Sequence, residues 1–206
     1  MKKPDILAAL EPLVEVLEKM VIPYYIGGSL CSSAFGIARA TLDIDLVSDL
    51  RMEHASILKE KLEKEYYVDE EMITDAISRH SSFNIIHLET MLKIDLFVPE
   101  NTSYDKEIFK RIRKDTLEEK EGAKEFCFAS PEDIVLKKLV WFRRGGSVSE
   151  KQWGDVTGIL KVQGNALDEP YLRRWASGLG LSELLEKVIN ETNPGQEETE
   201  KKSLPH

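Results

Sequence analysis

The stretch YYIGGSLCSSAFGIARATLDIDLV, residues 24–47, constrains the fold of this chain more than any other. Its two ends, YYIGG and LDIDLV, are short apolar runs typical of buried strands, and the segment between them begins with glycine and has the composition of a helix. Side chains on a strand alternate between faces, so Asp43 and Asp45 are expected to point to one side of a sheet. The apolar residues expected on the opposite, core-facing side are Leu42, Ile44 and Leu46.

A second apolar run, MLKIDLFVP, carries Asp95 between Ile94 and Leu96, the same pattern of an acid within an apolar strand. If the two strands are neighbours, three carboxylates lie close together, and like charges resist ionisation unless a cation offsets them. Hard oxygen ligands suit Mg²⁺ or Mn²⁺. The pattern predicts a site for two-metal phosphoryl chemistry, in which the metals activate a hydroxyl and stabilise the leaving pyrophosphate.

The residues that precede the acids suit a phosphate group. The glycine pair ending at Gly28 allows backbone N–H groups to approach a ligand closely, and Ser29 opens a helix whose positive end attracts anions. Arg39 lies four residues before Asp43, where phosphate binding and an ion pair with the acids are equally open. Thr41 is expected to fix this loop by hydrogen bonding. Phosphates and metals are therefore expected side by side.

The order of these residues resembles the signature of the nucleotidyltransferase superfamily with the DNA polymerase β-type fold. The elements in order are Ile26, Gly28, Ser29, the thirteen residues 30–42, the pair DID and the acid of KIDLF. The resemblance extends over residues 22–98. Within it, the run RATLDID is similar to that of the smaller prokaryotic enzymes of the superfamily, including the AbiEii-like toxin nucleotidyltransferases.

The resemblance implies an α/β fold with a mixed sheet and flanking helices. It also implies a Mg²⁺-dependent enzyme that transfers an NMP moiety from an NTP, such as ATP, to a hydroxyl acceptor and releases pyrophosphate. In such an enzyme Asp43 and Asp45 would hold the metals. Asp95 would complete the cluster and accept or orient the acceptor proton.

After the run KEFCFAS, which is expected to be the last strand, the chain becomes helical. Helix starts are predicted at Ser130, Ser149 and Asp168, because each side chain can cap a helix. The chain is expected to divide into a catalytic domain of residues 1–129, a helical extension of residues 130–190 that closes the cleft, and a disordered polar tail of residues 191–206.

Lys138 borders the apolar stripe of the first helix of this extension. A lysine in such a position usually extends to water. Against this, the related enzymes carry a lysine at the matching Lys-Leu step, so the resemblance implies that Lys138 rather than Lys137 meets the triphosphate.

Two further expectations concern helix packing. Residues 4–20 have helical spacing, which Pro12 is expected to kink or restart. The tryptophans of the helical part are expected to be core anchors, with base stacking as the alternative. These tryptophans are Trp141, Trp153 and Trp175.

Composition limits the partners of the chain. Lys plus Arg (28) against Asp plus Glu (37) gives a net charge of −9, so the average field repels nucleic acid. Cys31 and Cys127 are far apart, and no Cys/His cluster offers a zinc site. The start lacks a signal peptide, and no apolar run reaches membrane-helix length, so a cytoplasmic protein without a membrane partner is expected.

The acceptor stays open: an RNA end, a protein hydroxyl and a small molecule are all compatible with the sequence. An antibiotic nucleotidyltransferase is one alternative, because an acidic protein suits a cationic drug. The other alternative is a non-catalytic nucleotide-binding or regulatory module, paired with an antitoxin protein.

Overall fold

The computed structural model describes residues 4–38 and 40–192. The chain divides into two compact units. Of the described residues, the sheet unit contains 4–31 and 40–130, and the helical unit contains 32–38 and 131–192. The helix α2 (Gly28–Phe35) contributes its first half to the sheet unit and its second half to the helical unit.

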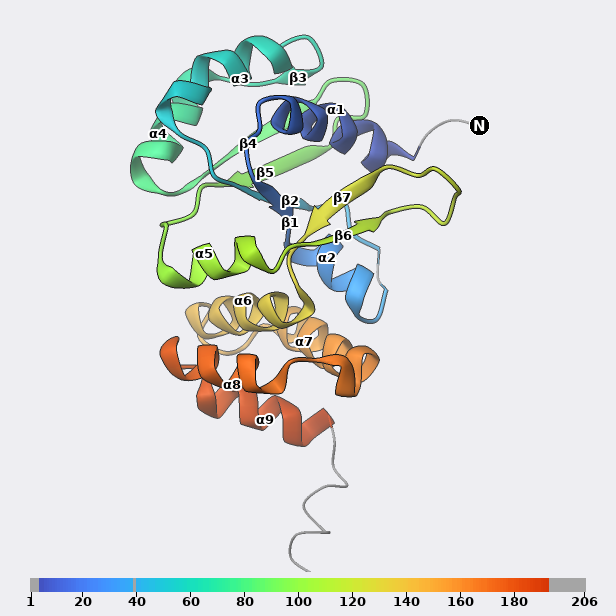
Figure 1. Cartoon of the computed structure of the whole chain (residues 1–206), viewed down its shortest axis with the longest axis vertical. Coiled ribbons are helices and arrows are strands. Elements are labelled where there is room, and N and C mark those ends of the chain that lie inside the picture. Colours follow the sequence, from blue (N-terminus) through green and yellow to red (C-terminus); the bar gives the residue numbers. More distant parts are fainter. Residues whose placement is uncertain (1–3, 39, 193–206) are drawn as a thin grey trace, which may run out of the picture. The chain divides into compact units, whose positions relative to one another are not determined.

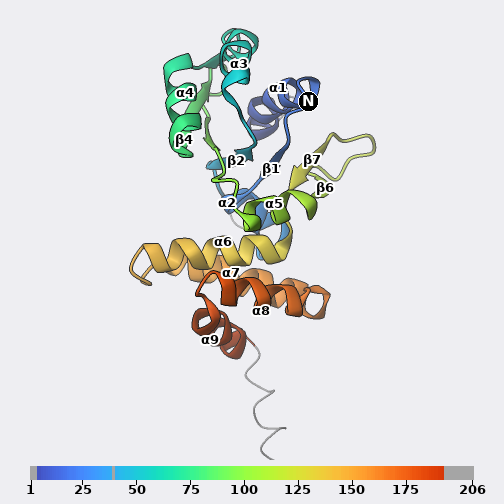
Figure 2. The ribbon, with the colours of Figure 1, turned by 60° about the vertical axis from the view of Figure 1, so that its left-hand side comes forward.

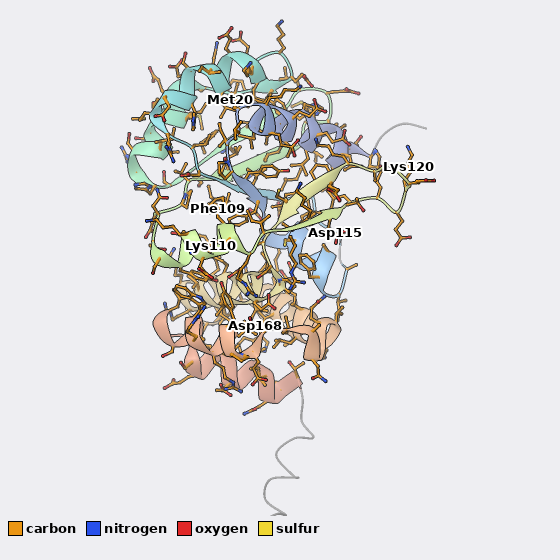
Figure 3. The ribbon with its side chains drawn as sticks, viewed as in Figure 1. Met20, Phe109, Lys110, Asp115, Lys120 and Asp168 are labelled. Atoms are coloured by element: carbon orange, nitrogen blue, oxygen red, sulfur yellow. The ribbon has the colours of Figure 1, made fainter. Side chains whose placement is uncertain are left out.

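The described part of the sheet unit contains a seven-stranded sheet with the order β3-β4-β5-β2-β1-β7-β6 (Figure 1). The strands are β1 (Tyr24–Ile26), β2 (Ile44–Ser48), β3 (Tyr66–Tyr67), β4 (Ser82–His87), β5 (Lys93–Phe97), β6 (Arg113–Thr116) and β7 (Glu125–Phe128). Strand β2 pairs antiparallel with β1 and parallel with β5, which confirms the predicted mixed sheet. β6 and β7 form a hairpin whose loop carries Lys120 at its tip (Figure 3).

Helices of the sheet unit lie on both faces of this sheet. They are α1 (Asp5–Lys19), the 3₁₀ turn η1 (Met52–His54), α3 (Ala55–Leu62), α4 (Glu70–Arg79) and α5 (Ser103–Lys110). In two views of the ribbon, α1, α3 and α4 lie on one face and α5 lies on the other (Figures 1 and 2). Within its own unit, the sheet therefore has helices against both of its faces.

The two faces of β2 differ in character, as the alternation of its sequence predicts. Ile44 and Leu46 are 1% and 0% exposed and form part of the core. The intervening Asp45 points to the opposite face. Tyr25, which pairs with Val47 on that opposite face, contacts the ring of Phe109 in α5 at a centroid distance of 5.2 Å (Figure 3). Asp45 therefore lies on the face that α5 partly covers.

Leu42 departs from the predicted pattern. It was expected in the core with Ile44, but it is 71% exposed. The strand β2 begins only at Ile44. The alternation of faces therefore does not extend back to Leu42, and the prediction for this residue is wrong.

The helix α1 runs from Asp5 to Lys19 through Pro12. Beside the proline, the Tyr66 hydroxyl of β3 donates to the Ala9 carbonyl oxygen (2.7 Å) and accepts from the Leu13 N–H (3.1 Å). It thus bridges the donor and the acceptor of one i to i−4 helical hydrogen bond, at the turn that proline disturbs. The helix is continuous through Pro12, so the expected restart is wrong, while the expected kink stays a prediction.

The helical unit follows the predicted starts closely. Its helices after α2 are α6 (Pro131–Arg144), α7 (Glu150–Gln163), the 3₁₀ turn η2 (Gly164–Ala166), α8 (Glu169–Gly178) and α9 (Ser182–Thr192). Ser149 and Asp168 cap α7 and α8 by accepting from the N–H groups of Gln152 (3.4 Å) and Tyr171 (3.0 Å). These capping predictions are confirmed.

Two details of the helical unit differ from expectation. The helix α9 continues to Thr192, past the predicted end at residue 190, and its Glu191 accepts a hydrogen bond from the indole N–H of Trp153 (2.8 Å). The rest of the predicted tail lies outside the described residues. Trp141 is 50% exposed, so it is not a core anchor. Along the described chain, no helix has both the length and the apolar character needed to cross a bilayer.

Candidate active site

The carboxylate of Asp45 lies against the first residue of α2. Strand β1 ends at Ile26, and the next N–H, that of Gly27, donates to the Asp45 carbonyl oxygen at 2.9 Å. Gly28 then begins α2 with φ +54°, and a Cβ built on it would lie 1.7 Å from Asp45 Oδ2. Only glycine fits this position, because both the backbone conformation and the carboxylate exclude a side chain.

The first turn of α2 holds the glycine pair in place. The Cys31 N–H donates to the Gly27 carbonyl oxygen at 3.1 Å, and Ser29 is 4% exposed. The start of a helix carries the positive end of its dipole and favours anions. The start of a helix, which favours anions, and the carboxylate of Asp45 therefore meet at Gly28; phosphate binding there stays a prediction.

Asp45 and Asp95 are register partners. The parallel strands β2 and β5 pair Ile44 with Ile94, Asp45 with Asp95 and Leu46 with Leu96. Neighbouring strands lie about 4.8 Å apart, and paired residues point to the same face. The two acids therefore lie side by side on the face opposite the core.

Asp43 lies just before β2. It is exposed, and its N–H donates to the Thr41 hydroxyl oxygen at 3.2 Å. This hydrogen bond confirms the predicted role of Thr41 in fixing the loop. Arg39, the other predicted residue of this loop, lies outside the described residues.

Lys93 is a functional candidate that the sequence analysis missed. It precedes Asp95 by two residues on β5, and its Nζ lies 2.7 Å from Asp95 Oδ2, with side-chain exposures of 52% and 25%. This hydrogen bond raises the pKa of Lys93, and the charges of Asp43 and Asp45 raise it further. The ammonium of Lys93 therefore interacts electrostatically with all three acids. The alternation K-I-D could have indicated it, since Lys93 and Asp95 share a face.

Comparison with known proteins bears on the fold. No protein-family model matches the sequence, and no curated protein matches it significantly. Among solved structures, the crystal structure of ANT(2'')-Ia in complex with adenylyl-2''-tobramycin matches with a TM-score of 0.55 and 14% identity, covering 85% of this chain and 98% of that chain. The solution structure of the antibiotic-resistance factor ANT(2'')-Ia matches with a TM-score of 0.52 and 12% identity, covering 88% and 96%.

This chain has the nucleotidyltransferase fold. A third match, to the lincosamide antibiotic adenylyltransferase LnuA, has a TM-score of 0.47 and 16% identity and covers 79% of this chain and 98% of that chain. The mixed sheet expected from the sequence is thus the sheet of a nucleotidyltransferase fold. The similarity to AbiEii-like enzymes in particular stays a prediction.

The donor set of this nucleotidyltransferase fold suits a hard divalent cation. Carboxylate oxygens are the ligands that Mg²⁺ and Mn²⁺ prefer, and Asp45 and Asp95 supply them from paired positions. Across residues 4–38 and 40–192, however, no three His, Cys, Asp or Glu side chains are grouped closely enough to hold a metal ion. The carboxylate of Asp95 is instead turned to Lys93. Asp45 and Asp95 therefore fit such a cation by the type of their ligand atoms and by the face of the sheet that they share.

Lys138 lies in the helical unit and is buried, with 4% exposure. Its Nζ lies 2.6 Å from Oδ2 of Asp155 in α7, and the two side chains are 6% and 7% exposed. The ammonium therefore does not extend to water. Asp155 carries no sequence signal for this pairing, because the contact joins two helices that only the fold brings together.

The acids that begin α6 have a structural role within the helical unit. Asp133 is fully buried and accepts a hydrogen bond from the Tyr171 hydroxyl at 2.7 Å. Glu132 accepts one from the N–H of Asp168 at 2.9 Å. Both bonds reach the start of α8, so the Pro-Glu-Asp sequence of α6 fixes the neighbouring helix.

Proposed function

We propose that this chain is a Mg²⁺- or Mn²⁺-dependent nucleotidyltransferase, which transfers an NMP moiety from an NTP to a hydroxyl acceptor and releases pyrophosphate. The observation that carries the proposal is the position of Asp45. Its carboxylate lies against Gly28 at the start of α2 and is in register with Asp95 of β5. The two proposed metal ligands thus lie beside a helix start that favours anions, and this arrangement supports the proposal.

The residues have distinct parts in this proposal. Asp43, Asp45 and Asp95 would hold the cation or cations, which, when bound, lower the pKa of the attacking hydroxyl and offset charge on the leaving pyrophosphate. The backbone of Gly28 and Ser29 would bind phosphate oxygens at the positive end of α2. Asp95 would also orient the acceptor hydroxyl and take up its proton.

Two further residues are proposed to bind the nucleotide. Arg39 would contact a phosphate from the loop before Asp43. Lys138 would offset triphosphate charge, and this role requires its ammonium to leave or to share its partner Asp155. A purely structural ion pair is the competing role for Lys138.

The acceptor is proposed to be a hydroxyl of a small cationic molecule. The match to ANT(2'')-Ia, whose crystal structure holds adenylyl-2''-tobramycin, covers 85% of this chain and supports this choice. The net charge of −9 is also compatible with a cationic acceptor. An RNA end, a protein hydroxyl and a toxin paired with an antitoxin are the alternatives that the test must separate.

The test uses labelled ATP, CTP, GTP and UTP with Mg²⁺, first with tobramycin and then with cell extract, while pyrophosphate release is measured. Label on tobramycin supports the cationic acceptor, and label on RNA or protein assigns one of the alternatives. Binding of an NTP, detected by a thermal shift, without pyrophosphate release under any of these conditions would favour a non-catalytic nucleotide-binding module.

A further inference from the structure

Lys93 lies on one face of the sheet with Asp45 and Asp95, and Asp43 lies just before strand β2. Asp45 and Asp95 are paired across β2 and β5, and Lys93 is two residues before Asp95 on the same strand. Asp43 lies just before β2, so strand alternation does not assign it to a face. Alternation brings Lys93 to the face of Asp45 and Asp95, where it supplies one positive charge beside these acids.

Lys93 contacts Asp95, which is a predicted metal ligand. Its Nζ lies 2.7 Å from Asp95 Oδ2, an oxygen that a divalent cation would need. An ammonium and a metal ion cannot occupy the same side of one carboxylate oxygen, since both are cations and both require contact distance. A metal that binds Asp95 through the side of Oδ2 that Lys93 occupies must therefore displace the ammonium.

The displacement is feasible because the ion pair is partly solvated. The Lys93 side chain is 52% exposed and that of Asp95 is 25% exposed. Ion pairs of this kind contribute about 0 to 1 kcal/mol, and the four-carbon stem of lysine lets the ammonium move away without a change in the backbone. Lys93 thus opposes the metal without excluding it.

We infer that Lys93 competes with the metal: it offsets part of the charge of the acids before the cation binds and thereby lowers the affinity of the site for divalent ions. This inference rests on the proposed function, because it assumes that Asp45 and Asp95 are metal ligands. Lys93 is a positioning residue in this account, since it acts on the carboxylate of Asp95 and not on the substrate. The alternative is an ion pair that only stabilises the sheet.

The experiment is a Mn²⁺ titration of the whole chain without nucleotide, followed by electron paramagnetic resonance of the free ion. Lys93→Met removes the charge and keeps the length of the side chain, and Lys93→Arg keeps the charge. Lys61→Met is the matched control, because Lys61 is exposed on α3, which lies on the opposite face of the sheet (Figure 2). Mn²⁺ binding that is lost in Asp45→Asn is assigned to the proposed site at Asp45 and Asp95.

We expect Lys93→Met to bind Mn²⁺ about tenfold more tightly than the unsubstituted chain, and Lys93→Arg and Lys61→Met to bind it as the unsubstituted chain does. If Asp45→Asn weakens binding but Lys93→Met leaves the affinity unchanged, the inference about Lys93 is wrong and the metal site stands. Equal tightening by Lys93→Arg and Lys93→Met would also overturn it, because the charge would then not matter. If Asp45→Asn changes nothing in any background, the metal site of the proposed function fails as well.

Discussion

Asp45 of β2 and Asp95 of β5 are register partners on two parallel strands in the interior of the sheet. The residues on either side of each acid are almost fully buried, so the backbone holds both acids firmly in place. Two carboxylates held side by side disfavour each other's ionisation. This cost to stability is expected where the pair binds a cation, and the ion pair between Lys93 and Asp95 offsets part of it.

The first prediction concerns this pair. Asp45→Asn removes a ligand charge and is expected to abolish Mg²⁺-dependent transfer, while the free energy of unfolding stays the same or rises because repulsion with Asp95 is relieved. Asp43→Asn is expected to abolish transfer in the same way. Thermal unfolding and a pyrophosphate-release assay on the same samples check both parts. Full activity in either variant would show that the substituted aspartate is not a metal ligand.

The second prediction concerns the start of α2. Gly28→Ala places a Cβ where Asp45 Oδ2 now lies and requires a positive φ from alanine. We expect it to lower the free energy of unfolding by about 2 to 4 kcal/mol and to abolish transfer, since the Asp45 carboxylate must move. Gly27→Ala is the matched control, because its Cβ would meet only the ring of Tyr25 at 3.9 Å. Similar losses in both variants would show that the collision with Asp45 is not the cause.

The third prediction concerns the proline in α1. Tyr66→Phe removes the hydroxyl that bridges the Ala9 carbonyl and the Leu13 N–H in the core, and it is expected to cost about 1 to 3 kcal/mol of the free energy of unfolding. Tyr67→Phe is the control, because Tyr67 is 62% exposed. Chemical denaturation measures both. A loss below about 0.5 kcal/mol for Tyr66→Phe would mean that α1 tolerates Pro12 without this bridge.

The fourth prediction separates the two roles of Lys138. Lys138→Met and Asp155→Leu, each alone, are expected to cost about 3 to 5 kcal/mol of stability, because each breaks the ion pair between two buried charges and leaves one of them in place. The double variant is expected to be more stable than either single variant. The double variant still lacks the ammonium of Lys138. Its apparent KM for NTP is therefore expected to rise about tenfold or more if Lys138 binds the nucleotide.

An apparent KM that does not change in the stable double variant would contradict nucleotide binding by Lys138 and leave the ion pair with Asp155 as its whole role. Lys161→Ala serves as the control for the loss of one positive charge from the helical unit, because Lys161 is exposed on α7. It is expected to change neither the free energy of unfolding nor the KM.

The elements that the sequence predicts best are those with local signals. The glycine at Gly28, the caps at Ser149 and Asp168, and the acids Asp45 and Asp95 within apolar runs all follow from short-range rules about backbone and alternation. Their positions in the structure agree with the prediction. The mixed sheet follows because the two acid-bearing runs are short and apolar and are separated by helical segments.

The parts that could not be predicted depend on contacts between distant segments. The support of Pro12 by Tyr66 joins residues more than 50 positions apart, and no local rule indicates it. The burial of Lys138 against Asp155 is of the same kind. The prediction for Leu42 is wrong for a different reason. Alternation assigns a side chain to a face only inside a strand, and the ends of strands are the features that a sequence predicts least reliably.

Transfer of label from an NTP to an acceptor is the decisive measurement of the proposed nucleotidyltransferase activity. The purified chain and its Asp45→Asn variant are incubated with Mg²⁺ and each labelled NTP, in the presence of tobramycin or of cell extract, and the labelled product is identified as pyrophosphate appears. The account predicts that the unsubstituted chain transfers label to a hydroxyl acceptor with matching release of pyrophosphate and that Asp45→Asn transfers none. Equal transfer by both proteins, or NTP binding with no transfer to any acceptor, would contradict it.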